Sequence, residues 1–248
     1  MRLIGNLLLA LVVLVFFNSC FDAPHFPVTP EIEYNGIIFR KGLPTTLVPT
    51  PSDTLILTVN FKDGDGDLGV GVGDSTNIKY VNRIYYQFFD KSFVTYKTKR
   101  TDPRYDTLPD FVRPYTCTNW EITYNYDSAE PKPLDTLYFQ LNPNYYNIFI
   151  DIYVQQADGN TFKKFDWLNE FPGSCLVGGL NGRFPVLSKD LSVATVQEGK
   201  IRYSMPSAVW LILFSIKPLY LNVYIQDRAL HKSKPVSTPV FTLQSIQK

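Results

Sequence analysis

Three stretches of this chain alternate apolar and polar residues with a period of two, and this alternation most restricts the folds open to the chain. In residues 54–61, 146–156 and 219–226, leucine, isoleucine, valine or phenylalanine occupies alternate positions. Successive side chains of a strand point to opposite faces, so this period is typical of a strand with one face against a core. We therefore expect strands of this kind to form most of the fold.

Composition favours the same fold class. The chain has 16 Tyr and 18 Phe, and aromatic residues make up 15% of it. Large aromatic side chains pack well on a pleated sheet, and many of the 18 Pro fall between the expected strands. We predict an all-β fold, an antiparallel β-sandwich of immunoglobulin-like or related topology with long loop insertions. One domain over residues 31–248 is the first choice, and two small β domains are the alternative.

Shorter patterns predict the remaining strands. They are expected at residues 31–40, 79–97 (two strands), 120–126, 137–141, 161–167, 199–204, 208–216 and 240–243. Asn35-Gly36 is a candidate tight turn inside the first of these, and residues 98–114 are expected to be a loop. The segment from Ala208 to Phe214 is apolar on both faces, which indicates either a strand buried on both sides or a docking surface for a membrane-barrel partner.

The N-terminus carries an apolar segment without a polar residue over residues 7–17. A spanning helix needs roughly 20 apolar residues to cross about 30 Å of hydrocarbon, so residues 1–19 are predicted to be a signal peptide. The segment ends in Ser19-Cys20, which resembles a bacterial lipobox. The resemblance implies that Cys20 is lipidated and that residues 20–30, rich in proline, form a tether to the outer membrane. Asp22, two residues after this cysteine, resembles the acidic export signal of Bacteroidota-type surface lipoproteins. This resemblance slightly favours the cell surface over the periplasmic face.

The mature chain is expected to be electrically neutral. Removal of residues 1–19 takes away only Arg2 and leaves 23 basic against 23 acidic residues, which argues against a nucleic-acid partner. The remaining cysteines, Cys117 and Cys175, are predicted to form a disulfide because exported proteins meet oxidants. Closing a loop of about 58 residues would stabilise the fold by roughly 4 kcal/mol. Two buried free thiols are the alternative.

An acidic loop follows the first clearly alternating strand. Asp63, Asp65 and Asp67 have the spacing of positions 1, 3 and 5 of a calcium loop, and Asp74 falls at position 12. Side-chain oxygens at alternate positions of a tight turn can converge on one hard cation. Leu68 replaces the glycine of the EF-hand, so the loop predicts either a calcium site of another kind or a plain Gly/Asp turn. No cofactor is required, and calcium is the candidate ion.

The same loop carries a resemblance to a family. The sequence FKDGDGDLG at residues 61–69 and the late YIQD at residues 224–227 are similar to segments of a group of uncharacterised Bacteroidota-type outer-membrane lipoproteins with a DGDGDLG loop. The resemblance covers the N-terminal third and the last strand. It implies an exported β-sandwich lipoprotein and brings no established activity.

Residue types needed for common enzyme mechanisms are sparse. The chain has only His25 and His231, and it contains no CxxC, HExxH, Walker A or GxSxG motif. A hydrolase built on two carboxylates is the least favoured hypothesis, because nothing singles out a pair among the 23 acidic residues. Trp120, Trp167 and Trp210 are interpreted either as a sugar-binding face or, more simply, as core residues.

These patterns together support two hypotheses about function. The first is a non-enzymatic outer-membrane lipoprotein that serves as an accessory or interaction subunit and binds another envelope protein. The alternative is a surface module that binds a glycan or another ligand, with calcium as the candidate ion. In both, a lipid on Cys20 attaches the chain to the membrane.

Overall fold

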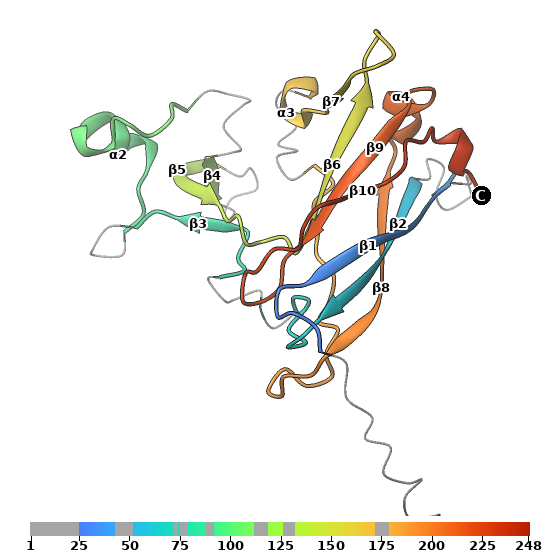
Figure 1. Ribbon diagram of the computed structural model, residues 1–248. Helices are drawn as coiled ribbons and strands as arrows, with labels where there is room; N and C mark the ends of the chain where they lie inside the picture. The colour runs from blue at the N-terminus through green and yellow to red at the C-terminus, as the bar shows by residue number, and fades with distance from the viewer. Residues whose placement is uncertain are drawn as a thin grey trace, which may run out of the picture.

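A computed structural model of the chain describes residues 25–42, 52–71, 74, 79–87, 92–111, 119–125, 132–171 and 179–248. Cys20, Cys117 and Cys175 lie outside these ranges, so their lipidation and disulfide stay predictions. The described residues form three antiparallel sheets (Figure 1), which confirms the predicted all-β, sandwich-like fold class. Within the described ranges, no helix combines the length and the hydropathy needed to cross a bilayer.

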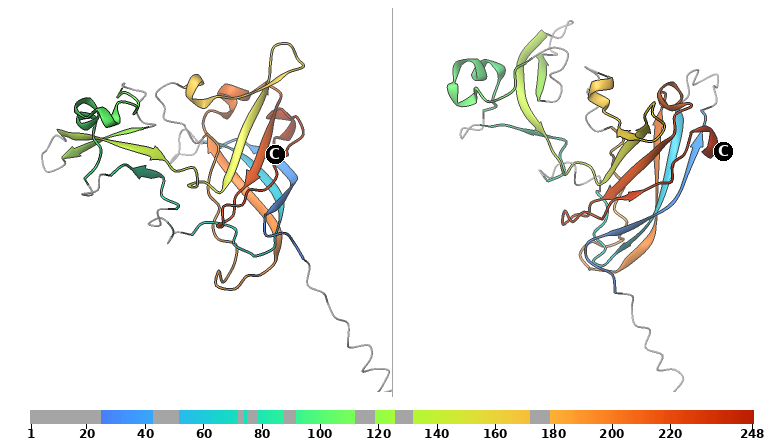
Figure 2. Two further views of the ribbon diagram at one scale, coloured as in Figure 1. Left: turned by 60° about the vertical axis from the view of Figure 1, so that its left-hand side comes forward. Right: turned by 45° about the horizontal axis from the view of Figure 1, so that its top comes forward.

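Two of the sheets form the sandwich (Figures 1 and 2). The first sheet has the strand order β1 (Glu31–Arg40), β2 (Asp53–Asp63), β8 (Gln197–Ser207). The second has the order β10 (Val236–Ser237), β9 (Leu219–Ile225), β6 (Ile148–Gln155), β7 (Phe162–Lys164). Each sheet thus joins strands from distant parts of the chain.

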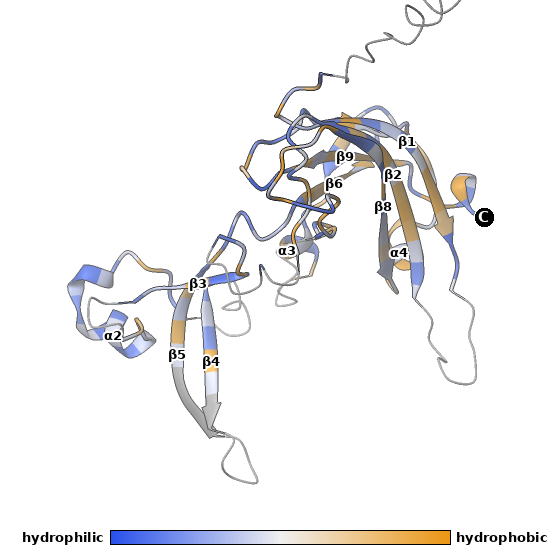
Figure 3. Ribbon diagram, turned by 90° about the horizontal axis from the view of Figure 1, so that it is seen from below, coloured by the Kyte–Doolittle hydropathy of each residue, from blue (hydrophilic) through white to orange (hydrophobic). Residues whose placement is uncertain are grey.

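The predicted alternation builds the core between these sheets. Leu55 and Leu57 of β2 are at most 1% exposed, as are Leu221 and Val223 of β9. In the β6–β9 pair, Ile152 lies opposite Leu221, so both side chains share the buried face. Figure 3 shows apolar residues concentrated along β2 and part of β1. Removal of this apolar area from water contributes the main favourable part of the free energy of folding, at roughly 25 cal/mol per Å².

The third sheet belongs to a separate lobe, defined here as the described residues between 79 and 142. Its strands, in spatial order, are β3 (Arg83–Tyr85), β5 (Lys132–Leu141) and β4 (Trp120–Asn125). Val94, Trp120 and Tyr138 form a small core of its own. The lobe is inserted between β2 and β6 and projects to one side of the sandwich (Figures 1 and 2).

The predicted strand at residues 208–216 is wrong. The structure has a short helix there, α4 (Trp210–Phe214). Trp210 and Phe214, four residues apart, both pack into the sandwich core, whereas Ile212 is 77% exposed. The Trp210 Nε1–H donates to the Met205 carbonyl oxygen at 2.9 Å. A short run of consecutive apolar residues has no period of its own, and here the tertiary contacts selected a helical turn.

Two further predicted features differ in detail. Asn35-Gly36 makes no turn, because β1 runs through it with a register shift between Tyr34 and Gly36, a β-bulge. Residues 240–243 form no regular strand, and only Phe241 bridges to Leu219. The last strand is instead β10, which ends before this segment; the short helix η4 (Gln244–Ile246) follows it.

Two predicted non-helical segments contain short helices. The expected loop at residues 98–114 includes most of α2 (Tyr96–Thr101) and all of η2 (Pro103–Tyr105). Thr95 caps α2, since its Oγ1 accepts from the Thr98 N–H at 3.2 Å. The expected strand at 161–167 ends at Lys164, and α3 (Trp167–Glu170) begins behind an Asp166 cap.

Replacement of a fully buried leucine tests this core. Leu55→Ala should lower the free energy of unfolding by about 2–5 kcal/mol, because Leu55 is 0% exposed in the central strand β2. Ile212→Ala is the matched control and should change it by less than about 0.5 kcal/mol. Urea denaturation followed by circular dichroism measures both. Equal losses in the two variants would contradict the assigned core.

Candidate functional site

The alternation of β2 places a carboxylate on the buried face of the sandwich. Phe61 points into the core, and two residues later Asp63, the last residue of β2, occupies the same face and is 0% exposed. Asp63 lies opposite Gln197 of β8 in the strand register. Directly opposite residues in an antiparallel pair point to the same side, so these two side chains lie on the same face at this end of the sandwich.

Glycines let the loop after β2 fit closely against two other segments. The Gly64 N–H donates to the Pro27 carbonyl oxygen at 2.9 Å, and a Cβ on Gly64 would collide with the backbone there. Gly66 has φ +72°, and a Cβ on it would collide with the Thr195 carbonyl oxygen. Only glycine can adopt this positive φ readily and also leave room for so close a contact with another backbone segment. The loop is thereby fixed between the start of the described chain and the segment before β8.

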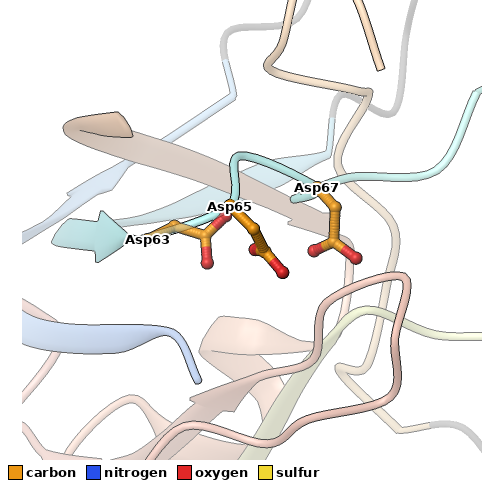
Figure 4. A group of neighbouring side chains, drawn as sticks. All are labelled: Asp63, Asp65 and Asp67. Atoms are coloured by element: carbon orange, nitrogen blue, oxygen red, sulfur yellow. The ribbon is translucent and has the colours of Figure 1, made fainter. Parts of the chain in front are cut away.

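The loop brings three carboxylates together (Figure 4). Asp63, Asp65 and Asp67 each offer one oxygen, and these oxygens all lie within 4.8 Å of one another. Both oxygens of Asp63 and Oδ1 of Asp65 and of Asp67 are buried and have no hydrogen-bond partner among the described residues. The Oε1 atom of Gln197 is buried and unpartnered in the same sense. The arrangement suits a cation, because it offers buried acceptors without donors.

Burial and mutual repulsion perturb these groups. Burial raises the pKa of Asp63 from 3.8 to about 7, and the carboxylates of Asp65, Asp67 and Asp227 add to the rise. The Gly66 backbone N–H acts in the opposite direction and lowers the pKa of Asp63. Burial and then Asp227 also raise the pKa of Asp67. Removing charge from water without a compensating partner disfavours the ionised form.

Asp227 is a fourth carboxylate near the cluster, and the sequence reasoning missed it. It follows β9, is 3% exposed, and has its own partners. The His231 N–H donates to Oδ1 at 2.7 Å, and His231 Nδ1 lies 2.9 Å from Oδ2. The alternation of β9 could have predicted that Asp227 faces the core, since it follows Val223 and Ile225 at the same period of two. The same turn approaches the loop, because the Ala229 N–H donates to Asp67 Oδ2 at 3.0 Å.

Asp74 does not join the cluster, so the predicted fourth ligand at this position is wrong. Its carboxylate forms a bidentate pair with Arg228, at 2.5 and 3.0 Å, and also accepts from the Gly71 N–H at 2.7 Å. The hydrogen bonds with Arg228 lower the pKa of Asp74. Asp74 is therefore held in a bidentate pair with a guanidinium, outside the group of three carboxylates.

Arg228 connects the sandwich to the lobe. Its carbonyl oxygen accepts from the Lys79 Nζ and from the Tyr80 hydroxyl, where the chain enters the lobe. Where the chain leaves it, the Asn142 side-chain amide donates to the carbonyl oxygens of Lys79 and Val81, at 3.0 and 2.8 Å. The two crossings between lobe and sandwich are therefore tied together next to the acidic loop.

The three tryptophans do not form one sugar-binding face. Trp120 is 3% exposed in the core of the lobe, and Trp210 is 1% exposed in the sandwich core. Trp167 alone is half-buried at the surface, where it lines a pocket of about 490 Å³ with Asp151 and Lys164 among other residues. Asp151 and Lys164 form an ion pair at 2.8 Å.

One face of the lobe carries half-buried and exposed aromatic and charged side chains. We define the lobe face as Arg83, Tyr85, Phe93, Glu121 and Leu141. Arg83 forms an ion pair with Glu121 at 2.7 Å, and the Tyr85 hydroxyl also donates to Glu121. The Phe93 ring lies edge-on to Tyr85, with centroids 5.8 Å apart. Phe93 is 40% exposed and Leu141 36%.

The fold and the site define an all-β, sandwich-like protein with a carboxylate cluster at one end and a projecting lobe. Comparisons of the chain with models of known protein families, with curated proteins and with solved structures find no match. The resemblance of residues 61–69 to Bacteroidota-type lipoproteins therefore stays a prediction.

The raised pKa of Asp63 predicts a pH dependence in the presence of a chelator. Between about pH 4 and pH 7 the folded protein holds a proton on Asp63 that the unfolded chain has released, so this group lowers stability as the pH rises. Asp63→Asn removes the effect, and at pH 8 it should raise the free energy of unfolding by more than about 1 kcal/mol. At pH 4 the variant and the wild type should differ little.

The matched control for this experiment is Asp158→Asn. Asp158 is fully exposed and caps its own turn, and hydrogen bonds from Thr161 lower its pKa. It should therefore give no gain at pH 8. Urea denaturation at both pH values measures the difference, and an Asp63→Asn variant less stable than the wild type at pH 8 in chelator would refute the electrostatic account.

Proposed function

We propose that this chain is a non-enzymatic, lipid-anchored outer-membrane protein that binds another envelope protein through the lobe face. The lipid on Cys20 attaches the sandwich to the membrane, and the cell surface is slightly favoured over the periplasmic face. The proposal needs no cofactor for binding the partner. The observation that supports it is the lobe, a small folded unit held away from the sandwich.

The lobe face has the composition of a protein-binding surface. Tyrosine, phenylalanine and arginine are enriched in protein interfaces and in the few residues that carry most of the binding energy. Here Tyr85 and Phe93 contact each other, and the Arg83 guanidinium lies 4.6 Å from the centroid of Phe139. An exposed aromatic side chain keeps apolar area in water. A protein that covers it on binding removes this area from water, which makes binding more favourable.

The lobe face is also held in a fixed shape. Glu121 accepts from both Arg83 and Tyr85, which restrains three side chains of neighbouring strands. Beneath them, Phe139 is 0% exposed. Side chains already fixed in the free protein lose less conformational entropy on binding. This favours a specific protein partner.

The anchor predicts that Cys20→Ser removes the protein from membranes. Wild type should incorporate labelled palmitate and sediment with the outer membrane, since two or more acyl chains give stable anchoring. Cys20→Ser should incorporate none, whereas the control Cys117→Ser should be labelled and sediment as the wild type does. Palmitate on Cys20→Ser, or wild type without label, would contradict the anchor.

The lobe face predicts a loss of partner on Phe93→Ser. Full-length, lipidated protein is extracted from native membranes in mild detergent and purified, and co-purifying proteins are identified by mass spectrometry. Loss of a central interface aromatic costs about 2 kcal/mol or more, or roughly 30-fold in affinity. A partner that the wild type recovers in stoichiometric amount should therefore be largely lost from Phe93→Ser.

Ile212→Ser is the matched control for this experiment. Ile212 is an exposed apolar residue on α4 of the sandwich, outside the lobe, so its replacement should leave the partner in place. Recovery of the wild type alone would contradict the proposal and turn attention to ligand binding at the Trp167 pocket. Loss of the partner from Ile212→Ser but not from Phe93→Ser would place the interface on the sandwich instead.

A further inference from the structure

We propose that the loop from Asp63 to Asp67 binds one calcium ion. The inference goes beyond the proposed partner binding and does not depend on it. The proposed ligands are carboxylate oxygens of Asp63, Asp65 and Asp67, with the Oε1 atom of Gln197 as a neutral oxygen beside them. All of these oxygens are buried and lack a hydrogen-bond partner among the described residues.

The state of Asp63 is the observation that points to a ligand. Three aspartates among the described residues are buried, namely Asp53, Asp63 and Asp227. Asp53 accepts from the Gly42 N–H at 3.0 Å, and Asp227 accepts from His231. Asp63 is 0% exposed, yet neither of its oxygens has a partner in good hydrogen-bond geometry among the described residues, and Asp65 and Asp67 lie beside it. A buried carboxylate without a donor is costly unless a cation compensates it.

Protein cations do not supply this compensation. Arg228 is paired with Asp74, and its guanidinium uses two nitrogens on that carboxylate. His231 is paired with Asp227. No ion pair of Asp63, Asp65 or Asp67 occurs in the described ranges. The negative charge of the cluster is therefore available to an external ion.

The ligand atoms favour calcium among the common metal ions. All are oxygens, which hard cations prefer, and zinc or copper would favour nitrogen or sulfur. Calcium binds oxygens at about 2.3–2.6 Å, so ligands on opposite sides of the ion lie about 4.6–5.2 Å apart. Magnesium, at about 2.0–2.1 Å, would need about 4.2 Å. The carboxylate oxygens of the cluster lie within 4.8 Å of one another, so all three can contact one ion. Several protein oxygens around one ion favour calcium, because magnesium usually keeps several waters and binds only one or two carboxylates.

A bound ion would brace three distant parts of the chain. The loop that supplies the carboxylates holds Pro27 through Gly64, at 2.9 Å, and Thr195 through the Asp65 carbonyl oxygen, at 3.2 Å. Asp67 also holds Ala229 of the turn after β9. Calcium would thus fix the first described residues of the chain to the end of the sandwich.

Calorimetry and thermal unfolding test the site. Full-length protein in mild detergent is stripped with a chelator, dialysed, and titrated with calcium chloride, and in parallel with magnesium chloride. We expect about one calcium bound per chain. At calcium 100-fold above Kd, Tm should rise by about 5 °C or more, and magnesium at the same concentration should give a much smaller shift.

Three variants locate the ion. Asp63→Asn and Asp65→Asn should each weaken calcium binding at least tenfold and remove most of the rise in Tm. Asp65 is only half-buried, so its variant serves if Asp63→Asn does not fold. Asp158→Asn, in an exposed Asp-Gly turn of the β6–β7 hairpin, should keep the wild-type affinity. The proposal is overturned if wild type shows neither heat nor a shift in Tm with calcium, if magnesium acts equally, or if both cluster variants bind as the wild type does.

Discussion

The register of β2 is the constraint on which the rest of this structure depends. Its period of two directs Leu55, Leu57, Val59 and Phe61 into the sandwich core, and the same period then directs Asp63 to the buried face. A strand cannot change the face of one residue without shifting the others. The carboxylate therefore enters a region of low polarity as a direct consequence of the packing that stabilises the sandwich.

This placement explains the contacts that gather around the loop. Glycines 64 and 66 allow Pro27 and the segment before β8 to approach it, and the turn after β9 approaches from the opposite sheet. The neighbouring Arg228 joins that turn to Asp74 and to the entrance of the lobe. The charge of the cluster, the position of the first described residues and the base of the lobe are thus connected through one small region.

The strands with a clear alternation of apolar and polar residues could be predicted from the sequence alone. Residues 54–61, 146–156 and 219–226 correspond to β2, β6 and β9 within about two residues at each end, because one apolar face and one polar face leave little alternative. The helix α4 was missed because a run of apolar residues fits a strand or a helix, and burial of Trp210 and Phe214 decided between them.

The acidic loop shows where local spacing stops being informative. The positions of Asp63, Asp65 and Asp67 within one tight loop are a local property, and these residues do come together. Asp74 has the spacing of a twelfth ligand, but its partner Arg228 is 154 positions away, and no local pattern reveals that contact. Asp227 approaches the cluster from the other sheet, so its place depends on how the two sheets pack.

Anomalous scattering from a crystal grown in calcium would test the central claim most directly. The account predicts one anomalous peak enclosed by the carboxylates of Asp63, Asp65 and Asp67, with oxygens at about 2.3–2.6 Å from it. A well-ordered loop with no peak at that position, and with water or a protein donor on the Asp63 oxygens, would contradict the account.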